Sequence, residues 1–178
     1  MQLNWKKLFW RSGLLICIFT FVYILIVFWW GQKQRNIQVA VKQISEIRWN
    51  VVANRLALMQ LEKLRENTST EERASLFSRL NQEELRGREL IEQRSKEKEV
   101  NLELGKRWEE ILRRLTGMYE SQGQLLTSLR QQQTYAAGIE ILRSERATKL
   151  IVEQTNLIYE LSYWEDLLRE KLKPNQKQ

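Results

Sequence analysis

The hydrophobic and polar positions divide the chain into one continuous apolar run and a long remainder in which apolar residues recur periodically. The apolar run, Gly13–Trp30, contains eighteen residues without a charge. A helix over this run is about 27 Å long, close to the thickness of the hydrocarbon core of a bilayer. We therefore predict that residues 1–31 form a short basic tail and a transmembrane anchor helix.

The residues at both ends of this run are typical of a membrane interface. Tryptophan rings settle between headgroups and acyl chains, and Lys and Arg side chains reach the headgroups. The predicted interface residues are Trp5, Lys6, Lys7, Trp10, Arg11, Trp29, Trp30, Lys33 and Arg35. A cleaved signal peptide fits less well, because the run is long for a signal and no small-residue cleavage site follows it. The basic tail favours a cytoplasmic N-terminus, with the rest of the chain on the extracytoplasmic side.

Residues 32–173 show apolar positions at alternating spacings of three and four, which predicts helices that pack against one another. Four segments are distinguishable, and they begin near Gln32, Thr70, Leu104 and Ile139. The predicted helix-packing seam consists of Ile37, Ile44, Ile47, Val51, Asn54, Leu58, Leu61, Leu104, Trp108, Ile111, Leu115, Leu125, Leu150, Leu157, Leu161, Trp164 and Leu168.

The predicted fold class is all-α, with the N-terminal transmembrane helix followed by an antiparallel bundle of about four helices. The alternative is an elongated coiled coil in which the second and third segments form one helix, since both folds use the same packing. Apolar faces broader than a two-stranded seam favour the bundle.

Ser69 and Glu72 form a capping box that starts the second helix. We place a break near Gly138 and a frayed tail at residues 174–178 after Pro174.

Asn54 is a polar residue within the predicted seam. Such a residue either fixes the register of neighbouring helices at a cost in stability or lies at a rim position that reaches solvent. The first interpretation predicts that Asn54→Leu raises thermal stability.

The composition excludes many chemistries. The chain has no histidine and a single cysteine, Cys17, within the apolar run, so catalytic triads, imidazole ligands and thiolate zinc sites are not expected. The formal net charge is +7, but acidic and basic residues alternate closely and form no stripe suited to nucleic acid. Glutamate pairs such as Glu83-Glu84 are expected on helix surfaces, beside cations that pair with them. We expect no enzyme activity, no cofactor, no metal and no nucleic-acid partner.

These features predict a single-pass, membrane-anchored helical interaction or scaffold protein, an accessory or assembly subunit of a membrane complex. Its expected partners are the lipid bilayer and a protein, either a second copy or another membrane subunit.

An anchor followed by a four-helix bundle is also similar in layout to chemoreceptor sensor domains. That resemblance implies a ligand-binding sensory ectodomain acting through a partner, because this chain has no second membrane helix or signalling module. A further alternative is a spanin-like envelope coiled-coil protein.

Overall fold

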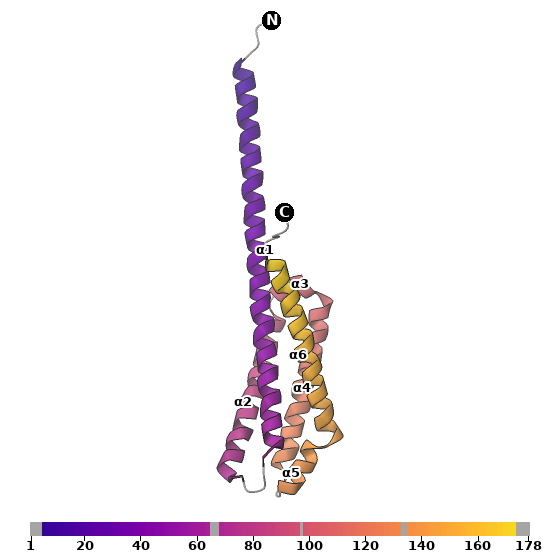
Figure 1. The fold of residues 1–178 in the computed structure, drawn as a ribbon. Helices are drawn as coiled ribbons and strands as arrows, with labels where there is room; N and C mark the ends of the chain where they lie inside the picture. The colour runs from indigo at the N-terminus through magenta and orange to yellow at the C-terminus, as the bar shows by residue number, and fades with distance from the viewer. Residues whose placement is uncertain (1–4, 65–67, 97, 133–134, 174–178) are drawn as a thin grey trace. The chain divides into compact units, whose positions relative to one another are not determined.

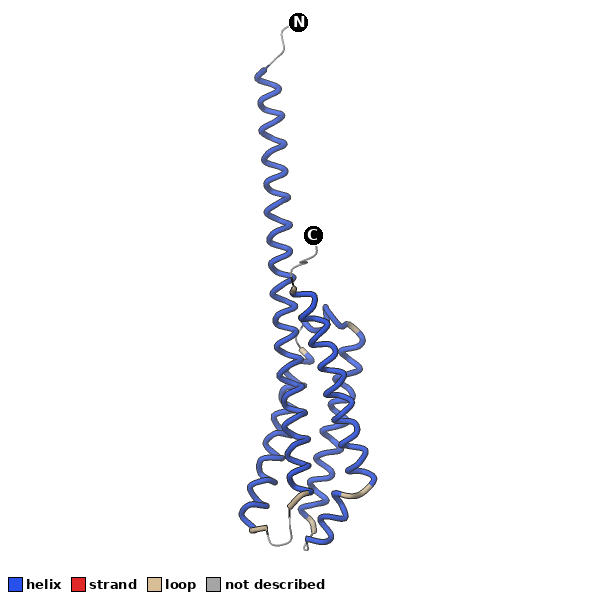
Figure 2. The backbone as a smooth tube through the Cα atoms, viewed as in Figure 1, coloured by secondary structure: helices blue, strands red, loops and turns tan. Residues whose placement is uncertain are grey.

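The computed structural model describes residues 5–64, 68–96, 98–132 and 135–173, without the side chains of residues 5–16, 98, 99, 135 and 136. Within these ranges the chain forms six helices and no strand (Figures 1 and 2). They are α1 (Trp5–Glu62), α2 (Thr70–Ser95), α3 (Lys98–Leu104), α4 (Lys106–Arg130), α5 (Tyr135–Leu142) and α6 (Glu145–Leu172). The predicted all-α class is confirmed.

The chain divides into two compact units, Met1–Asn36 and Ile37–Gln178. The first unit contains the N-terminal part of α1, and the second contains the rest of α1 together with the other five helices of the described ranges. The sequence places the corresponding boundary after Gly31. The predicted frayed tail, residues 174–178, lies outside the described residues.

The second unit is a helical bundle in which consecutive long helices run in opposite directions. The C-terminal part of α1 is followed by α2, α4 and α6, and the short helices α3 and α5 precede α4 and α6 (Figure 1). α4 packs against both α2 and α6. The elongated alternative, with the second and third segments merged into one helix, is wrong because the chain reverses between α2 and α4.

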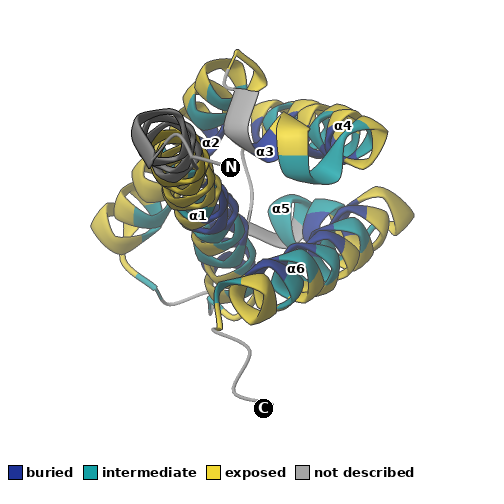
Figure 3. Ribbon diagram, turned by 90° about the horizontal axis from the view of Figure 1, so that it is seen from above, coloured by how far each residue is buried: buried dark blue, intermediate teal, exposed yellow. Residues whose placement is uncertain are grey.

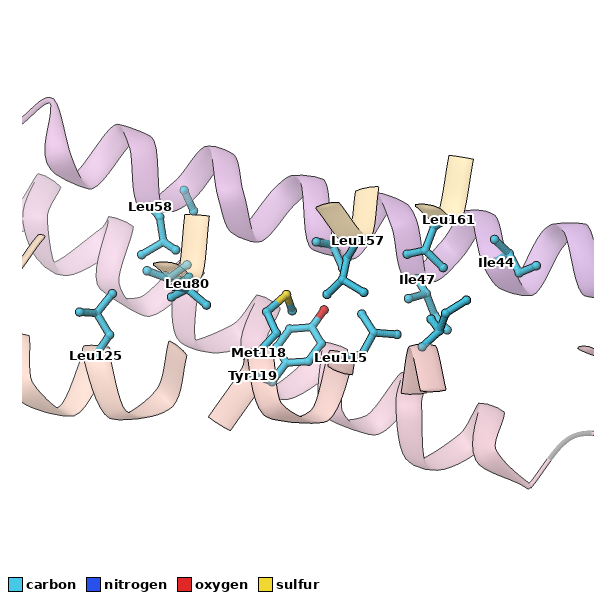
Figure 4. Packing of buried hydrophobic residues seen from close by; sticks show 14 of the residues in the cluster. Ile44, Ile47, Leu58, Leu80, Leu115, Met118, Tyr119, Leu125, Leu157 and Leu161 are labelled. Carbon is cyan, nitrogen blue, oxygen red and sulfur yellow. The ribbon is translucent and has the colours of Figure 1, made fainter. Parts of the chain in front are cut away.

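The hydrophobic core lies between the four long helices, where the buried residues face one another (Figure 3). In the close-up, Ile44 and Ile47 of α1 approach Leu161 of α6, and Leu115 of α4 lies beside Leu157 of α6 (Figure 4). The structure buries every predicted seam residue except Leu104 and Trp164, which are partly buried against the core. The spacing of three and four therefore marks the inward face of α1, α4 and α6.

The predicted start of the second helix is confirmed. Ser69 is the N-cap of α2, and its Oγ accepts a hydrogen bond from the backbone N–H of Glu72 at 3.1 Å. This bond satisfies one of the amides that the first turn of a helix leaves without a partner.

The predicted break near Gly138 falls a few residues late, because α4 ends at Arg130 and α5 begins at Tyr135, so that Gly138 itself lies inside α5. Glycine lowers helix stability by only about 1 kcal/mol relative to alanine, so packing tolerates it. A further boundary, between α5 and α6, lies at Ser144, whose Oγ accepts from the backbone N–H of Ala147 at 3.3 Å and caps α6. The predicted start of the third segment near Leu104 agrees with a boundary at Gly105, whose φ of 53° separates α3 from α4. This left-handed conformation suits glycine, which has no Cβ to clash.

Candidate functional site

The first unit carries a helix segment whose apolar side chains are exposed on all sides. Every residue from 17 to 30 is exposed. The large apolar side chains among them range from 45% exposed at Val22 to 72% at Phe28. Exposed apolar surface of this extent marks a region that contacts another apolar phase or molecule.

No helix in the part of the chain that the structure describes has both the length and the apolar character needed to cross a membrane. The predicted apolar run begins at Gly13, and the side chains of residues 13–16 lie outside the described part. The transmembrane anchor stays a prediction.

The predicted interface residues are only partly described. The side chains of Trp5, Lys6, Lys7, Trp10 and Arg11 lie outside the described part. At the other end, Trp29 and Trp30 are exposed, and the Lys33 ammonium lies 5.5 Å from the ring centroid of Trp29. Arg35 is also exposed.

In the second unit, a layer of buried amide side chains crosses the core. Asn54 of α1, Gln122 of α4 and Gln154 of α6 are all fully buried. Gln122 Nε2 donates to Asn54 Oδ1 at 2.5 Å, and Gln154 Nε2 donates to Gln122 Oε1 at 3.2 Å. Asn54 Nδ2 donates to the backbone carbonyls of Asn50 (2.9 Å) and Glu83 (3.3 Å). The layer therefore links all four long helices, and the rim interpretation of Asn54 is wrong.

Asn50 and Tyr119 extend this layer between α1, α2 and α4. The Tyr119 hydroxyl donates to Asn50 Oδ1, and Asn50 Nδ2 donates to Glu83 Oε2 at 3.1 Å. Burial raises the pKa of the Tyr119 hydroxyl well above its usual range, and the charges of Glu83 and Glu84 raise it further. The hydroxyl thus keeps its proton and remains a hydrogen-bond donor.

Two glycines allow the close packing of α2 against α4. A Cβ added to Gly87 of α2 would lie 2.2 Å from Cζ of Tyr119. A Cβ added to Gly123 of α4 would lie 3.0 Å from Nη2 of Arg88 and 3.2 Å from Oε1 of Glu84. The missing side chain at Gly87 leaves room for the Tyr119 ring, and the one at Gly123 leaves room for Glu84 and Arg88.

Glu84 is buried, contrary to the surface position expected for the glutamate pairs. It is 8% exposed and accepts from Arg88 Nε at 2.5 Å, so the expected pairing with a nearby cation is present. Arg88 Nη2 also donates to the backbone carbonyl of Tyr119 at 3.2 Å. The carboxylate is buried because Gly123 lets α4 approach this side of α2.

Arginine–glutamate pairs connect α6 to its two neighbours. Arg48 of α1 donates to Glu165 Oε2 at 2.9 Å, and Arg169 donates to Oε1 of the same carboxylate at 2.6 Å. On the other side of α6, Arg114 of α4 contacts Glu153 at 2.8 Å and Glu160 at 2.5 Å. The hydrogen bond to Glu153 raises the pKa of the Arg114 guanidinium, and partial burial opposes this effect.

An open groove of about 780 Å³ runs along the outer side of α1. Its lining includes Lys42 and Trp49 of α1, Arg86 of α2 and Arg169 of α6. Trp49 is 60% exposed, and the Arg48 guanidinium lies 5.0 Å from its ring centroid. Glu46 and Glu83 line the groove as well. An exposed tryptophan beside a cation is a feature of binding surfaces.

The described residues contain no group of three or more side chains suited to holding a metal ion. Most of the buried polar groups described above are amides and paired charges that bond between helices. The sequence pattern placed Asn54 in the seam but did not predict the bonds that connect it through Gln122 to Gln154. It missed Asn50 and Tyr119, and the one available signal was the four-residue spacing of Asn50 from Asn54.

The chain was compared with family models, with curated proteins and with solved structures, and none of them matches it.

Proposed function

We propose that this chain is a single-pass, membrane-anchored helical interaction protein that serves as an accessory or assembly subunit of a membrane complex. The observation that carries the proposal is the exposure of every residue from 17 to 30 in an apolar helical segment. Each large apolar side chain left in water costs about 1.5–3 kcal/mol relative to burial. A helix that is apolar on all sides suits a lipid environment, whereas a protein surface would cover one side.

The bundle supports the interaction part of the proposal. Its buried polar groups are largely occupied in bonds between helices, and its exposed surface carries aromatic residues such as Trp49, Tyr159 and Tyr163. Aromatic residues are enriched where proteins contact one another. We propose the orientation with the N-terminus in the cytoplasm and the bundle outside, because the short tail carries Lys6, Lys7 and Arg11.

The anchor is tested by reconstituting the full chain into vesicles and washing them at alkaline pH before flotation. We expect the unaltered chain to float with the vesicles. A Phe21→Arg/Ile24→Arg variant is expected to leave them, because each arginine at the centre of a membrane helix costs about 2.5–3.5 kcal/mol. Leu85→Arg, at an exposed position of α2, is the matched control and should float. Release of the unaltered chain would overturn the anchor, and protease protection of the bundle would report its orientation.

The interaction role is tested by the mass of the complex that the full-length chain forms when it is extracted from its native membrane in mild detergent. A stable complex with other identified chains supports an accessory subunit, and a homo-oligomer supports a scaffold. A monomer without partners would overturn both roles and favour the alternative of a ligand-binding ectodomain.

A further inference from the structure

The outer face of α6 carries exposed aromatic and acidic side chains in one stripe. Val152, Tyr159 and Tyr163 are 53%, 72% and 59% exposed, and spacings of seven and four place them on the same side of the helix. Asp166 and Glu170 continue this stripe toward the C-terminus and are exposed. Neither carboxylate forms an ion pair with any described residue. This face is therefore aromatic and negatively charged.

The outer face of α1 has the opposite charge. Trp49 and Leu56, seven residues apart, are 60% and 54% exposed. Lys42, seven residues before Trp49, forms an ion pair only with Glu46, at 4.0 Å, among the described residues. The other oxygen of Glu46 is bound by Arg94 at 2.5 Å. Arg86 lines the same groove and forms no ion pair with the described part of the chain. Glu46 and Glu83 also line this groove, against Lys42, Arg86 and Arg169, so this face is aromatic with a small net positive charge.

The two outer faces are neighbours on one side of the bundle. α1 and α6 run in opposite directions (Figure 1), and the Arg48–Glu165 pair joins them directly. Glu165 is only 5% exposed, so this ion pair belongs to the packed contact between the helices. The basic face of α1 and the acidic face of α6 thus lie beside each other, and both remain exposed.

We propose that a second copy of this chain covers these two faces, related to the first by a two-fold axis parallel to the helices. Such an axis exchanges the faces, so α1 of each copy packs against α6 of the other. The basic, tryptophan-bearing face then meets the acidic, tyrosine-bearing face twice in the same interface. Charge complementarity between these two faces selects a second copy as the occupant, because the chain itself carries both halves of the contact.

The Arg48–Glu165 pair also predicts the register of this dimer. Helices rise by about 1.5 Å per residue, so each step toward the N-terminus of α1 corresponds in height to one step toward the C-terminus of α6. Trp49 then lies one residue from the height of Tyr163 of the partner subunit. Lys42 lies one residue from the height of Glu170 of the partner subunit, and Leu56 lies two residues from the height of Tyr159 of the partner subunit.

The parallel arrangement rests on the proposed function, because two copies anchored in one membrane with the same orientation are related by an axis along the membrane normal. The charged and aromatic residues of the two faces all belong to the bundle, so the contact between them does not require the anchor. The experiments below therefore measure dimer formation and membrane attachment separately.

Cysteine cross-linking tests the contact between the faces. Two differently tagged forms of the full chain, both carrying Cys17→Ser, are reconstituted together in vesicles, one with Trp49→Cys and the other with Tyr163→Cys. We expect mild oxidation to give at least tenfold more mixed disulfide than the control pair of Arg113→Cys and Tyr163→Cys. Arg113 is exposed on α4, outside the two faces. Equal yields from the two pairs would overturn the proposed dimer.

Charge exchange tests the register without relying on cysteine chemistry. We expect Lys42→Glu and Glu170→Lys each to raise the dissociation constant of the dimer in mild detergent about three- to tenfold, and the two changes in one chain to restore it. Arg113→Glu, the matched charge change on α4, should leave it unaltered. A double variant no tighter than the single variants would overturn the pairing of Lys42 with Glu170.

Flotation of the same samples separates the two proposals. Vesicle-bound protein that forms no mixed disulfide above the control would overturn the dimer and leave the anchored interaction protein in place. Mixed disulfide in protein that does not float would overturn the anchor and leave the surface contact in place.

Discussion

At the scale of single residues, Asn54 connects three of the long helices within the buried polar layer. Its amide contacts α2 through the Glu83 carbonyl and α4 through Gln122, and Gln122 continues the connection to α6. Amides of this kind have both a donor and an acceptor, so each bond fixes the rotation of one helix relative to another. The layer therefore specifies how the four long helices align, in addition to stabilising them.

The bonds of Asn54 reverse the stability change that the sequence pattern predicts for Asn54→Leu. Leucine would leave Gln122 Nε2 buried without its acceptor, and an unsatisfied buried polar group costs about 1–3 kcal/mol. The Glu83 carbonyl would keep its bond from Asn50 Nδ2 at 3.1 Å. We expect the full chain in detergent to melt at a lower temperature, as followed by circular dichroism. Gln82→Leu, at an exposed position of α2, is the control and should change stability by less than about 0.5 kcal/mol. An unchanged or higher melting temperature for Asn54→Leu would contradict a structural role for the layer.

At the scale of helices, the sequence predicted the elements better than their ends and mutual contacts. The capping box at Ser69 identified the start of α2 because its bond is local and depends on residues three apart. Gly138 led to a break placed too late along the chain, because the low helix propensity of glycine is a small effect that packing overrides. The bonds of Gln122 and Gln154 were not predictable, since a periodic pattern gives the inward face but not the relative height of two helices.

The close contact between α2 and α4 leads to a prediction for two glycines that the sequence does not distinguish. Gly87→Ala would place a Cβ against the buried Tyr119 ring, and such overpacking costs about 1–3 kcal/mol. A Cβ at Gly117 of α4 would meet no described atom within 4 Å. Gly117→Ala should therefore stabilise the bundle by about 0.5–1 kcal/mol through helix propensity. Chemical denaturation measures the free energy of unfolding of each variant, which should fall for Gly87→Ala and rise for Gly117→Ala. A destabilisation of equal size at both positions would contradict the close contact between Gly87 and Tyr119.

At the scale of the whole molecule, the two units differ in what they bury. The core cluster begins at Ile37 and ends at Leu168, so its buried residues all belong to the second unit. The side chains from 17 to 30 contribute nothing to that core and are exposed. The change in hydrophobic pattern predicts a boundary after Gly31, whereas the two units meet after Asn36. The pattern could not predict where the core begins, because Ile37 and the preceding residues belong to the same continuous helix.

This division predicts that residues 37–178 fold without the first unit. We expect this fragment to be soluble and helical and to melt cooperatively, because it retains the complete core and the buried amide layer. A shorter fragment, residues 45–178, lacks Ile37, Ala40, Val41 and Ile44, all of which are buried. Its loss of stability should amount to several kcal/mol, since each large apolar side chain contributes about 1.5–3 kcal/mol when buried. Equal melting temperatures for the two fragments would mean that the first turns of α1 in the bundle contribute little to the core. A fragment 37–178 without a cooperative transition would mean that the bundle depends on the N-terminal unit.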